Sequence, residues 1–365
     1  MVNANCARLT IDLDGLAANY ATLREEAKGA EVAAVVKADG YGLGAGRISR
    51  RLWAEGVRSF YVARLEEGER LRSELGPQRP ATIHVFDGFT PGSGPRLAAA
   101  ALSPAISSQG QLSEAAAFAR TIGQALPCAL QVDTGMNRQG LTPQGLRAAM
   151  DAADAMKGLE VRVLVSHLGS GARPEDPHNR LQLQRFSAVR GLFPEAKASF
   201  AASAGIFLGE GFRFDQVRAG ISLYGGGPLE IPDTRLRAVA LLEAPVLDIR
   251  NVAPGERIGY GARMIAQSPM RIAILGAGYA DGVLRAGAGK AMAWCAGALR
   301  PIVMINMDLI AVDIGDAQLG PGDMVELLGP HALLDDQAAA AGTVAHECLT
   351  RLGERGERIY LGDGD

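Results

Sequence analysis

Cysteine is scarce and widely dispersed in this chain of 365 residues. Its four cysteines, Cys6, Cys128, Cys295 and Cys348, form no Cys-x-x-Cys pair. This spacing argues against a disulfide framework and a cysteine-based zinc site, and it is typical of proteins from a reducing compartment. We therefore expect a cytoplasmic protein without a metal site.

Long apolar runs and a strong charge of one sign are also missing. No uninterrupted apolar stretch approaches the length of a membrane span, and Met1–Asp14 has neither the basic start nor the apolar core of a signal peptide. The net charge is −3, and the lysines and arginines are scattered, which gives no footprint for nucleic acid or an anionic membrane. We expect neither a nucleic-acid partner nor a membrane partner.

Short apolar runs alternate with helical patterns over the first part of the chain. The first strand at 9–14 leads into a helix at 13–26, and eight further strands with intervening helices follow. This alternation predicts an α/β fold with a (β/α)8 barrel, and a doubly wound sheet is the alternative. The predicted strands are 32–37, 60–63, 82–86, 102–106, 126–132, 161–166, 198–201 and 216–219, and the helices include 46–55, 65–74, 111–123, 143–155 and 180–192.

The pattern changes near Pro232, where helical periodicity fades. β-rich runs with turn signals follow, 343–351 resembles a short helix, and the Ala-rich piece at 338–341 fits either a helix or a loop. This pattern predicts a small, mostly-β domain. Because the chain is too long for one small domain, we divide it into a barrel domain of residues 1–237 and a C-terminal β domain of residues 238–365.

Lys37 ends the first predicted barrel strand, within the string VVKADGYGLG. The carboxyl edge of such a sheet is where α/β active sites form. Partial desolvation there lowers the pKa of a lysine, and a free amine can form a Schiff base with a carbonyl cofactor, usually pyridoxal phosphate. The same pattern also fits a loop whose lysine simply reaches water.

The complete string resembles the cofactor-lysine motif of the alanine racemases, which are fold-type III pyridoxal phosphate enzymes. Further strings similar to those of the family occur in the family's order and span nearly the whole length. The resemblance implies pyridoxal 5'-phosphate as cofactor and a TIM-like barrel followed by a β domain. The strings are VDTGMNR at 132–138, SH at 166–167, ASAG at 202–205, VRAGISLYG at 217–225, RIGYGAR at 257–263, GYADG at 278–282 and NMD at 306–308.

The resemblance implies two catalytic bases, one for each face of the substrate Cα. Lys37 would serve one face and Tyr260 the other. An ordinary tyrosine is a poor base at neutral pH and needs nearby positive charge. Because the two residues lie in different domains, the resemblance implies a head-to-tail homodimer in which Tyr260 acts in the partner's site.

Arg218 is the residue that says most about the implied reaction type. By resemblance it meets the pyridine nitrogen of the cofactor, where many related enzymes place a carboxylate. An arginine only donates hydrogen bonds and does not deprotonate, so the nitrogen would stay unprotonated and the ring would be a weaker electron sink. That chemistry favours racemisation over transamination.

The other binding residues follow from the same resemblance. Arg138 would donate to the phenolic oxygen of the cofactor and lie near the substrate carboxylate, and His167 would hydrogen-bond Arg218. Judged locally, Tyr41 and Tyr260 also fit ordinary turn tyrosines, and His167 fits a structural histidine. The residues implied for the phosphate are Tyr41, Ser203, Gly220 and Ile221, and those implied for the substrate are Arg138, Tyr279 and the Met307 backbone.

Two positions depart from the family pattern. Gln131 stands where many relatives have a lysine that carries a carbamate and orients the equivalent of Arg138. Glu354 stands where many relatives have a tyrosine that faces phosphate and substrate. A neutral glutamine can accept a hydrogen bond from Arg138 but brings no charge.

We expect an isomerase that interconverts L- and D-alanine and supplies D-alanine for peptidoglycan biosynthesis. A broad-specificity or serine-preferring racemase of the same fold is the first alternative, because of Gln131 and Glu354. A non-catalytic barrel protein that binds pyridoxal phosphate is the second. Such proteins lack the β domain, so the string around Tyr260 counts against this alternative.

Overall fold

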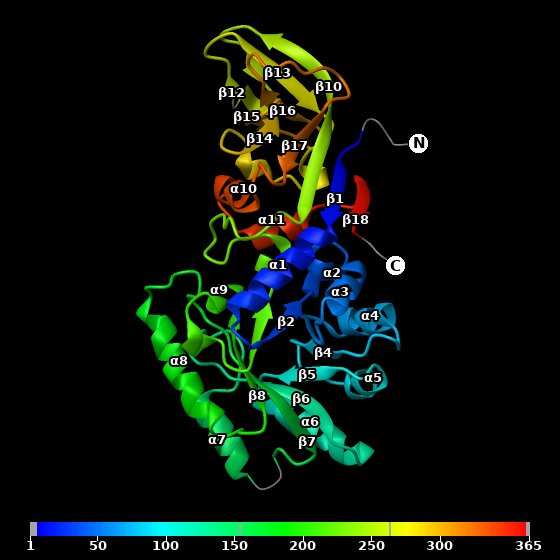
Figure 1. Cartoon of the computed structure of the whole chain (residues 1–365), viewed down its shortest axis with the longest axis vertical. Coiled ribbons are helices and arrows are strands. Elements are labelled where there is room, and N and C mark those ends of the chain that lie inside the picture. The colour runs from blue at the N-terminus through cyan, green and yellow to red at the C-terminus, as the bar shows by residue number, and fades with distance from the viewer. Residues whose placement is uncertain (1–5, 153–154, 263, 363–365) are drawn as a thin grey trace. The chain divides into compact units, whose positions relative to one another are not determined.

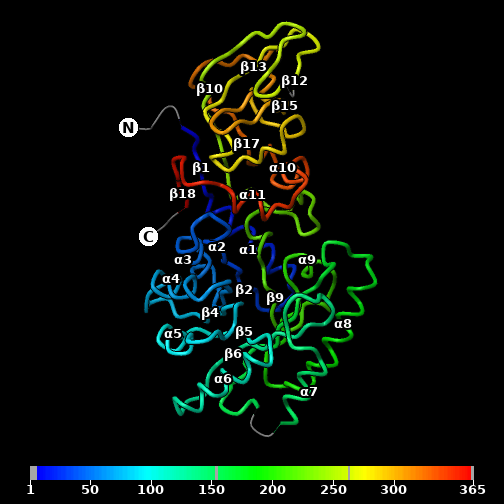
Figure 2. The backbone as a smooth tube through the Cα atoms, turned by 180° about the vertical axis from the view of Figure 1, so that it is seen from behind, coloured from blue at the N-terminus to red at the C-terminus, as the bar shows by residue number. Residues whose placement is uncertain are grey.

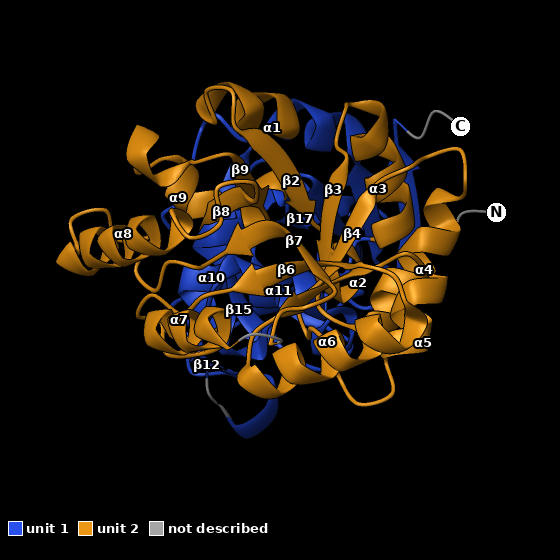
Figure 3. Ribbon diagram, turned by 90° about the horizontal axis from the view of Figure 1, so that it is seen from below, with its two compact units in different colours: residues 1–19, 41–43, 224–365 blue, residues 20–40, 44–223 orange. Residues whose placement is uncertain are grey.

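The computed structural model describes residues 6–152, 155–262 and 264–362 (Figure 1). The chain forms two compact units, coloured separately in Figure 3. The barrel unit comprises residues 20–40 and 44–223, and the sheet unit comprises residues 1–19, 41–43 and 224–365. Arg263, in the string at 257–263, and positions 153–154, in the predicted helix 143–155, lie outside the described residues.

The barrel unit contains a closed barrel of eight strands, each parallel to its neighbours. The predicted (β/α)8 barrel is therefore confirmed, and the doubly wound alternative is wrong because β9 closes onto β2. The strands are β2 (Glu31–Val35), β3 (Ser59–Val62), β4 (Thr82–Val85), β5 (Ser103–Ile106), β6 (Leu126–Gln131), β7 (Leu159–Val165), β8 (Lys197–Ala202) and β9 (Gln216–Ala219).

Helices surround the strands of the barrel unit (Figure 3). Local signals explain several of their boundaries. For example, the Thr142 hydroxyl accepts a 3.0 Å hydrogen bond from Gly145 N, and Pro143 occupies the first turn. The helices are α1 (Leu13–Glu26), α3 (Ala45–Ala54), α4 (Leu65–Leu75), α5 (Gly94–Ala99), α6 (Gln109–Ile122), α7 (Pro143–Asp151), α8 (Pro177–Arg190) and α9 (Ser203–Ile206).

The sheet unit is built on an eight-stranded sheet, which confirms the predicted mostly-β part. Its order is β13-β16-β15-β14-β17-β10-β1-β18, and a two-stranded sheet, β11-β12, accompanies it. The elements are β1 (Arg8–Asp12), β10 (Ala240–Val252), β11 (Arg257–Ile258), β12 (Met264–Ile265), β13 (Met270–Leu275), β14 (Met292–Cys295), β15 (Ala298–Ile305), β16 (Ile310–Asp313), β17 (Met324–Leu328) and β18 (Glu357–Leu361), with helices α10 (Leu334–Ala341) and α11 (Ala345–Arg351).

The first and last strands of the chain lie side by side in this sheet, β1 in blue and β18 in red (Figure 2). β1 pairs in parallel with β18 and antiparallel with β10. The predicted N-terminal strand therefore lies within the C-terminal sheet, between β10 and β18. Within the described part of the chain, no helix is both long enough and apolar enough to cross a membrane.

Candidate active site

Lys37 follows β2 and opens a left-handed turn, α2 (Lys37–Tyr41). The φ angles are 52° at Ala38, 54° at Asp39 and 58° at Tyr41. Side chains other than glycine rarely adopt this conformation, and such strain is concentrated at functional sites. Glu67 supports the turn, because its Oε1 accepts a 2.8 Å hydrogen bond from Ala38 N. The turn and the strand before it together fix the backbone at the lysine.

The surroundings of Lys37 favour its neutral amine. Burial lowers the pKa of Lys37, the positive charge of Arg138 lowers it further, and the Glu67 carboxylate partly opposes both effects. A neutral amine is the nucleophilic form of lysine. Lys37 therefore has the chemistry needed to bind a carbonyl compound covalently.

The loop after β6 presents Arg138. The Asp133 carboxylate accepts hydrogen bonds from Gly135 N at 2.8 Å and Met136 N at 2.9 Å, and Gly135 has a φ of 137° that favours glycine. Arg138 is exposed and makes no hydrogen bond to a described residue. Its charge nevertheless contributes to the lowered pKa of both Lys37 and Arg218. This loop thus supplies an available cation near both residues.

Gln131 is buried, and its Nε2 donates to the Gln139 carbonyl at 3.2 Å. Among the hydrogen bonds of the described residues, none joins Gln131 to Arg138. The glutamine therefore braces the backbone of the loop that carries Arg138.

Arg218 is a buried cation on β9. Its Nη1 donates to the carbonyl and the hydroxyl of Ser199, both at 2.7 Å. Its Nη2 donates to the Ser166 carbonyl and lies 3.4 Å from Nδ1 of His167. Burial lowers the pKa of Arg218 to about 10, so it stays protonated at neutral pH. Its Nε–H has no acceptor among the described residues and is available to a ligand.

The last two loops of the barrel meet at Ser203. The Ser203 hydroxyl accepts hydrogen bonds from Gly220 N at 3.0 Å and Ser222 N at 3.3 Å, and Ile221 lies between these two donors. Ser222 Oγ is buried and has no hydrogen-bond partner. A buried orphan hydroxyl calls for an unseen partner, and later barrel loops are frequent phosphate sites. The hydroxyls of Ser203 and Ser222 fit a phosphate group.

The predicted site residues divide between the two units. The barrel unit brings together, at or just beyond the carboxyl ends of its strands, Lys37, Arg138, His167, Ser203, Arg218, Gly220 and Ile221. The sheet unit holds Tyr41, Tyr260, Tyr279 and Met307.

Tyr41 is buried in the sheet unit against Tyr224, with ring centroids 4.5 Å apart, and against His346 at 5.8 Å. Burial raises the pKa of Tyr41 well above its ordinary value of 10, so its hydroxyl is neutral and able to donate. A neutral phenol suits a hydrogen bond to an anion.

Three other residues of the sheet unit are exposed in the single chain: Tyr260 (81%), Met307 (52%) and Tyr279 (42%). The loops of Tyr279 and Met307 are joined, because Tyr279 N donates to the Asn306 carbonyl at 2.9 Å and Ala280 N donates to the Met307 carbonyl at 3.0 Å. The amide of Met307 has no acceptor among the described residues. The Met307 loop therefore presents an unpaired amide beside the Tyr279 turn.

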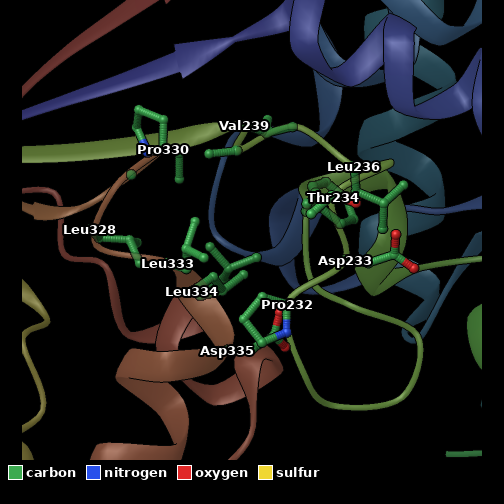
Figure 4. Close-up of a pocket in the computed structure, with 16 residues that line it drawn as sticks. Pro232, Asp233, Thr234, Leu236, Val239, Leu328, Pro330, Leu333, Leu334 and Asp335 are labelled. Atoms are coloured by element: carbon green, nitrogen blue, oxygen red, sulfur yellow. The ribbon is translucent and has the colours of Figure 1, made fainter.

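A cavity of about 320 Å³ lies elsewhere in the sheet unit (Figure 4). Pro232, Leu236, Val239 and Leu333 contribute to its largely apolar wall. Its lining includes no predicted site residue and no lysine, histidine or cysteine. We assign it no part in the chemistry.

Sequence reasoning missed Glu67 and Ser199. Glu67 occupies the first turn of an ordinary helix, α4, and Ser199 lies within a strand without any turn signal. No local pattern distinguishes either residue, because each is defined by what the fold brings against it.

Comparison with protein families gives two matches, one after the other along the chain. The family described as alanine racemase, N-terminal domain, matches residues 11–228, and alanine racemase, C-terminal domain, matches residues 239–360. The chain is 45% identical to an alanine racemase of Methylobacterium nodulans over 361 residues, covering 97% of this chain and 96% of the relative. It is 39% identical to a catabolic alanine racemase of Agrobacterium fabrum over 360 residues, covering 98% and 92%.

Solved structures resemble the whole chain as well. The alanine racemase of Bartonella henselae with covalently bound pyridoxal phosphate has a TM-score of 0.91 and 36% identity, with 98% of this chain and 99% of that one covered. The alanine racemase of Streptomyces coelicolor has a TM-score of 0.90 and 33% identity, with 98% of each chain covered.

Proposed function

The chain belongs to the alanine racemase family, and from this premise we propose that it is a pyridoxal phosphate-dependent isomerase that interconverts L- and D-alanine. The observation that supports the proposal most strongly is that Lys37 and Arg218 belong to the same barrel. One is a lysine of lowered pKa, and the other is a buried arginine with a free Nε–H.

Pyridoxal phosphate supplies an electron sink that stabilises negative charge at the substrate Cα. Lys37 would hold its carbonyl carbon, and Arg218 Nε–H would meet its ring nitrogen, with His167 beside the guanidinium. Arg138 would meet its phenolic oxygen. The residues proposed for its phosphate are Tyr41, Ser203, Gly220 and Ile221.

Lys37 and Tyr260 are the proposed bases. One removes the Cα proton from one face of the substrate, and the other delivers a proton to the opposite face. Arg138 and the Met307 amide would orient the substrate carboxylate, and Tyr279 would narrow the access to the pocket.

We propose that two copies of the chain form a head-to-tail homodimer and that Tyr260 acts in the partner's site. Tyr260 is 81% exposed in the single chain, which supports a role at a surface that a second copy covers. Catalysis by Tyr260 requires a positive environment, and a barrel containing Arg138 and Arg218 provides one.

Subunit mixing tests the shared site. Lys37→Ala and Tyr260→Phe are each expected to be nearly inactive alone. Random exchange makes half of the dimers mixed, and each mixed dimer has one intact site, so roughly a quarter of wild-type sites should return. Alanine racemisation is assayed after mild dissociation and mixing, with Lys37→Ala mixed with itself as the control. No recovery, with exchange confirmed by mass, would overturn the trans arrangement.

The second candidate function is a broad-specificity or serine-preferring racemase. It is favoured by Gln131, whose side chain donates to the Gln139 carbonyl and, within the described part of the chain, makes no hydrogen bond to Arg138. Racemisation assays with alanine, serine, lysine and arginine separate the two functions. The third candidate, a non-catalytic cofactor-binding protein, does not fit, because the chain has the β domain that such proteins lack.

For the physiological role we propose the supply of D-alanine for peptidoglycan in the cytoplasm. The wide spacing of the four cysteines, none of them in a Cys-x-x-Cys pair, fits a reducing compartment. Because the relative from Agrobacterium fabrum is named catabolic, the test must separate the two roles. A deletion strain that needs D-alanine for growth would support the biosynthetic role, and one that fails only on alanine as nitrogen source would support the catabolic role.

We also propose a domain boundary between residues 237 and 238. The two family matches stop at residue 228 and resume at 239, and β10 begins at Ala240. In this division β1 belongs to the barrel domain by sequence but pairs with a strand of the β domain's sheet. Separate expression of residues 238–365 with and without a β1 peptide tests whether that sheet needs the first strand.

A further inference from the structure

The centre of the barrel is polar and aromatic. Tyr61, His84, Ser103, Ser199 and Gln216 are all at most 3% exposed. Barrel interiors are normally filled by layers of branched aliphatic side chains. Buried polar groups are costly unless they are hydrogen-bonded, so this cluster must be held together by its own contacts.

Tyr61 on β3 connects this cluster to Arg218. The Tyr61 hydroxyl donates a 2.7 Å hydrogen bond to Gln216 Oε1. Gln216 and Arg218 are two residues apart on β9, so their side chains leave the strand on the same face. The Arg218 Cζ atom lies 6.0 Å from the centroid of the Tyr61 ring. The tyrosine therefore binds Gln216 by a hydrogen bond, and the guanidinium of Arg218 lies over its ring.

Ser199 provides a second link. Its hydroxyl accepts from Arg218 Nη1 at 2.7 Å. Burial raises the pKa of Tyr61, while the charge of Arg218 and the hydroxyl of Ser199 lower it. Arg218 is thus in contact with both the serine hydroxyl and the tyrosine ring.

The ring of Tyr61 is held in place by stacking. His84 stacks on it with centroids 4.4 Å apart at 21°, and Phe86 stacks on it at 5.2 Å. His84 is itself anchored, because its Nδ1 lies 3.1 Å from Ser103 Oγ. Burial lowers the pKa of His84 to about 4, so it is neutral at physiological pH and adds no charge beside Arg218.

The network ends at an ion pair between the first residues of β8 and β2. Lys197 Nζ lies 2.6 Å from Glu31 Oε2. Burial raises the pKa of Glu31, but hydrogen bonds with Lys197, Ser59 and Gln216 more than offset it. The Gln216 amide is therefore oriented from both sides, by Glu31 and by Tyr61.

We propose that Tyr61 is a positioning residue that holds the Arg218 guanidinium in place with its Nε–H directed at the ligand. The buried guanidinium has no carboxylate partner among its hydrogen bonds, so it depends on carbonyls, one hydroxyl, the His167 ring nitrogen and the face of an aromatic ring. This inference rests on the proposed function and deepens it, because it assigns the support of Arg218 to an unanticipated residue.

The test compares Tyr61→Phe and Tyr61→Leu in the full chain loaded with pyridoxal phosphate. The primary readout is hydrogen exchange at Arg218 Nε–H, measured by nitrogen-15 NMR. Tyr20 provides the matched control, because it is a buried tyrosine whose ring centroid lies 5.9 Å from Arg24 Cζ. Tyr20→Phe and Tyr20→Leu should leave the Arg218 signal and the activity unchanged.

Removing the ring in Tyr61→Leu should accelerate exchange at Arg218 Nε–H by roughly tenfold or more. It should also lower kcat and leave KM for alanine unchanged, because Arg218 does not meet the substrate carboxylate. Tyr61→Phe keeps the ring and should give an intermediate effect. Gln216→Leu, which removes the acceptor of the Tyr61 hydroxyl, should match Tyr61→Phe.

Unchanged exchange in Tyr61→Leu, with the far-UV spectrum and cofactor content of the wild type, would overturn the inference. If Tyr61→Leu does not fold, Tyr61→Phe and Gln216→Leu decide the matter by the same readout. Faster exchange with an unchanged kcat would support the coupling of Tyr61 to Arg218 and overturn the proposed role of Arg218 in catalysis. The two failures are therefore distinguishable.

Discussion

Arg355 binds the Asp281 carboxylate through two nitrogens, with Nε 2.9 Å from Oδ1 and Nη2 3.0 Å from Oδ2. Its remaining nitrogen, Nη1, lies 2.6 Å from Asp308 Oδ1. Asp281 closes the turn that carries Tyr279, and Asp308 follows Met307. One arginine from the C-terminal tail therefore ties together the two loops of the sheet unit that we propose for the substrate.

Replacing Arg355 by alanine should loosen both loops. The buried Asp281 carboxylate would lose its cation, and because Arg355 is half-exposed, we expect a loss of stability of only about 1–2 kcal/mol. KM for alanine should rise about threefold or more as the loops lose their orientation. Steady-state kinetics and urea unfolding measure both effects.

Arg300→Ala is the matched control, because Arg300 pairs with Asp316, which is 94% exposed, in the same unit. It should cost about 0.5 kcal/mol or less and leave KM unchanged. Equal kinetics for the two variants would show that Arg355 has no influence on substrate binding.

Arg218→Glu should change the type of reaction. A carboxylate at the ring nitrogen favours its protonated form, which strengthens the electron sink and prolongs negative charge at Cα. Racemisation should fall by about a hundredfold or more, and pyruvate formation from alanine should rise. The exposed Arg147 on α7 offers the control Arg147→Glu, which should behave as wild type. An unchanged rate in Arg218→Glu would mean that Arg218 does not meet the ring nitrogen.

Bicarbonate should not affect the activity of the wild-type enzyme. Gln131 has no amine to form a carbamate, and its amide is already bonded to the Gln139 carbonyl. Racemisation is measured in degassed buffer and again after bicarbonate is added. Gln131→Lys should acquire a bicarbonate dependence. A clear gain in the wild type would show that another lysine serves this purpose.

Acid should destabilise the barrel through His84. Burial lowers the pKa of His84 from its ordinary 6.5 to about 4. Between these pH values the unfolded chain binds a proton that the folded chain does not, so the contribution to stability is complete above about pH 6.5 and is lost as the pH falls to about 4. The shift corresponds to about 3 kcal/mol.

His84→Phe keeps a ring stacked on Tyr61 and removes the titrating group. The difference in unfolding free energy between pH 7 and pH 4 should be smaller in this variant by about 3 kcal/mol. Urea unfolding followed by circular dichroism at each pH measures the difference. An equal difference in the two proteins would show that His84 does not titrate during acid unfolding.

Local sequence was sufficient to predict much of the fold. All eight predicted barrel strands overlap observed ones, and the predicted helix 13–26 coincides with α1 (Leu13–Glu26). These elements can be predicted because burial imposes a local sequence pattern. A parallel strand has a continuous apolar run, and a surface helix has apolar residues with a period of 3.6. The candidate site residues came from motif strings. Their roles stay predictions that the variants above address.

Tertiary structure decided what no local pattern encodes. The pairing of β1 with β10 and β18 joins segments more than 200 residues apart, and its register depends on how the chain returns. The left-handed turn after Lys37 persists because Glu67 from another helix holds it. Tyr61 reads as one more apolar residue of a buried strand, and only closure of the barrel places its ring beside Arg218. The local order of apolar and polar residues determines which side chains are buried. The hydrogen-bond partner of a buried polar group depends instead on which strands become neighbours in the folded chain.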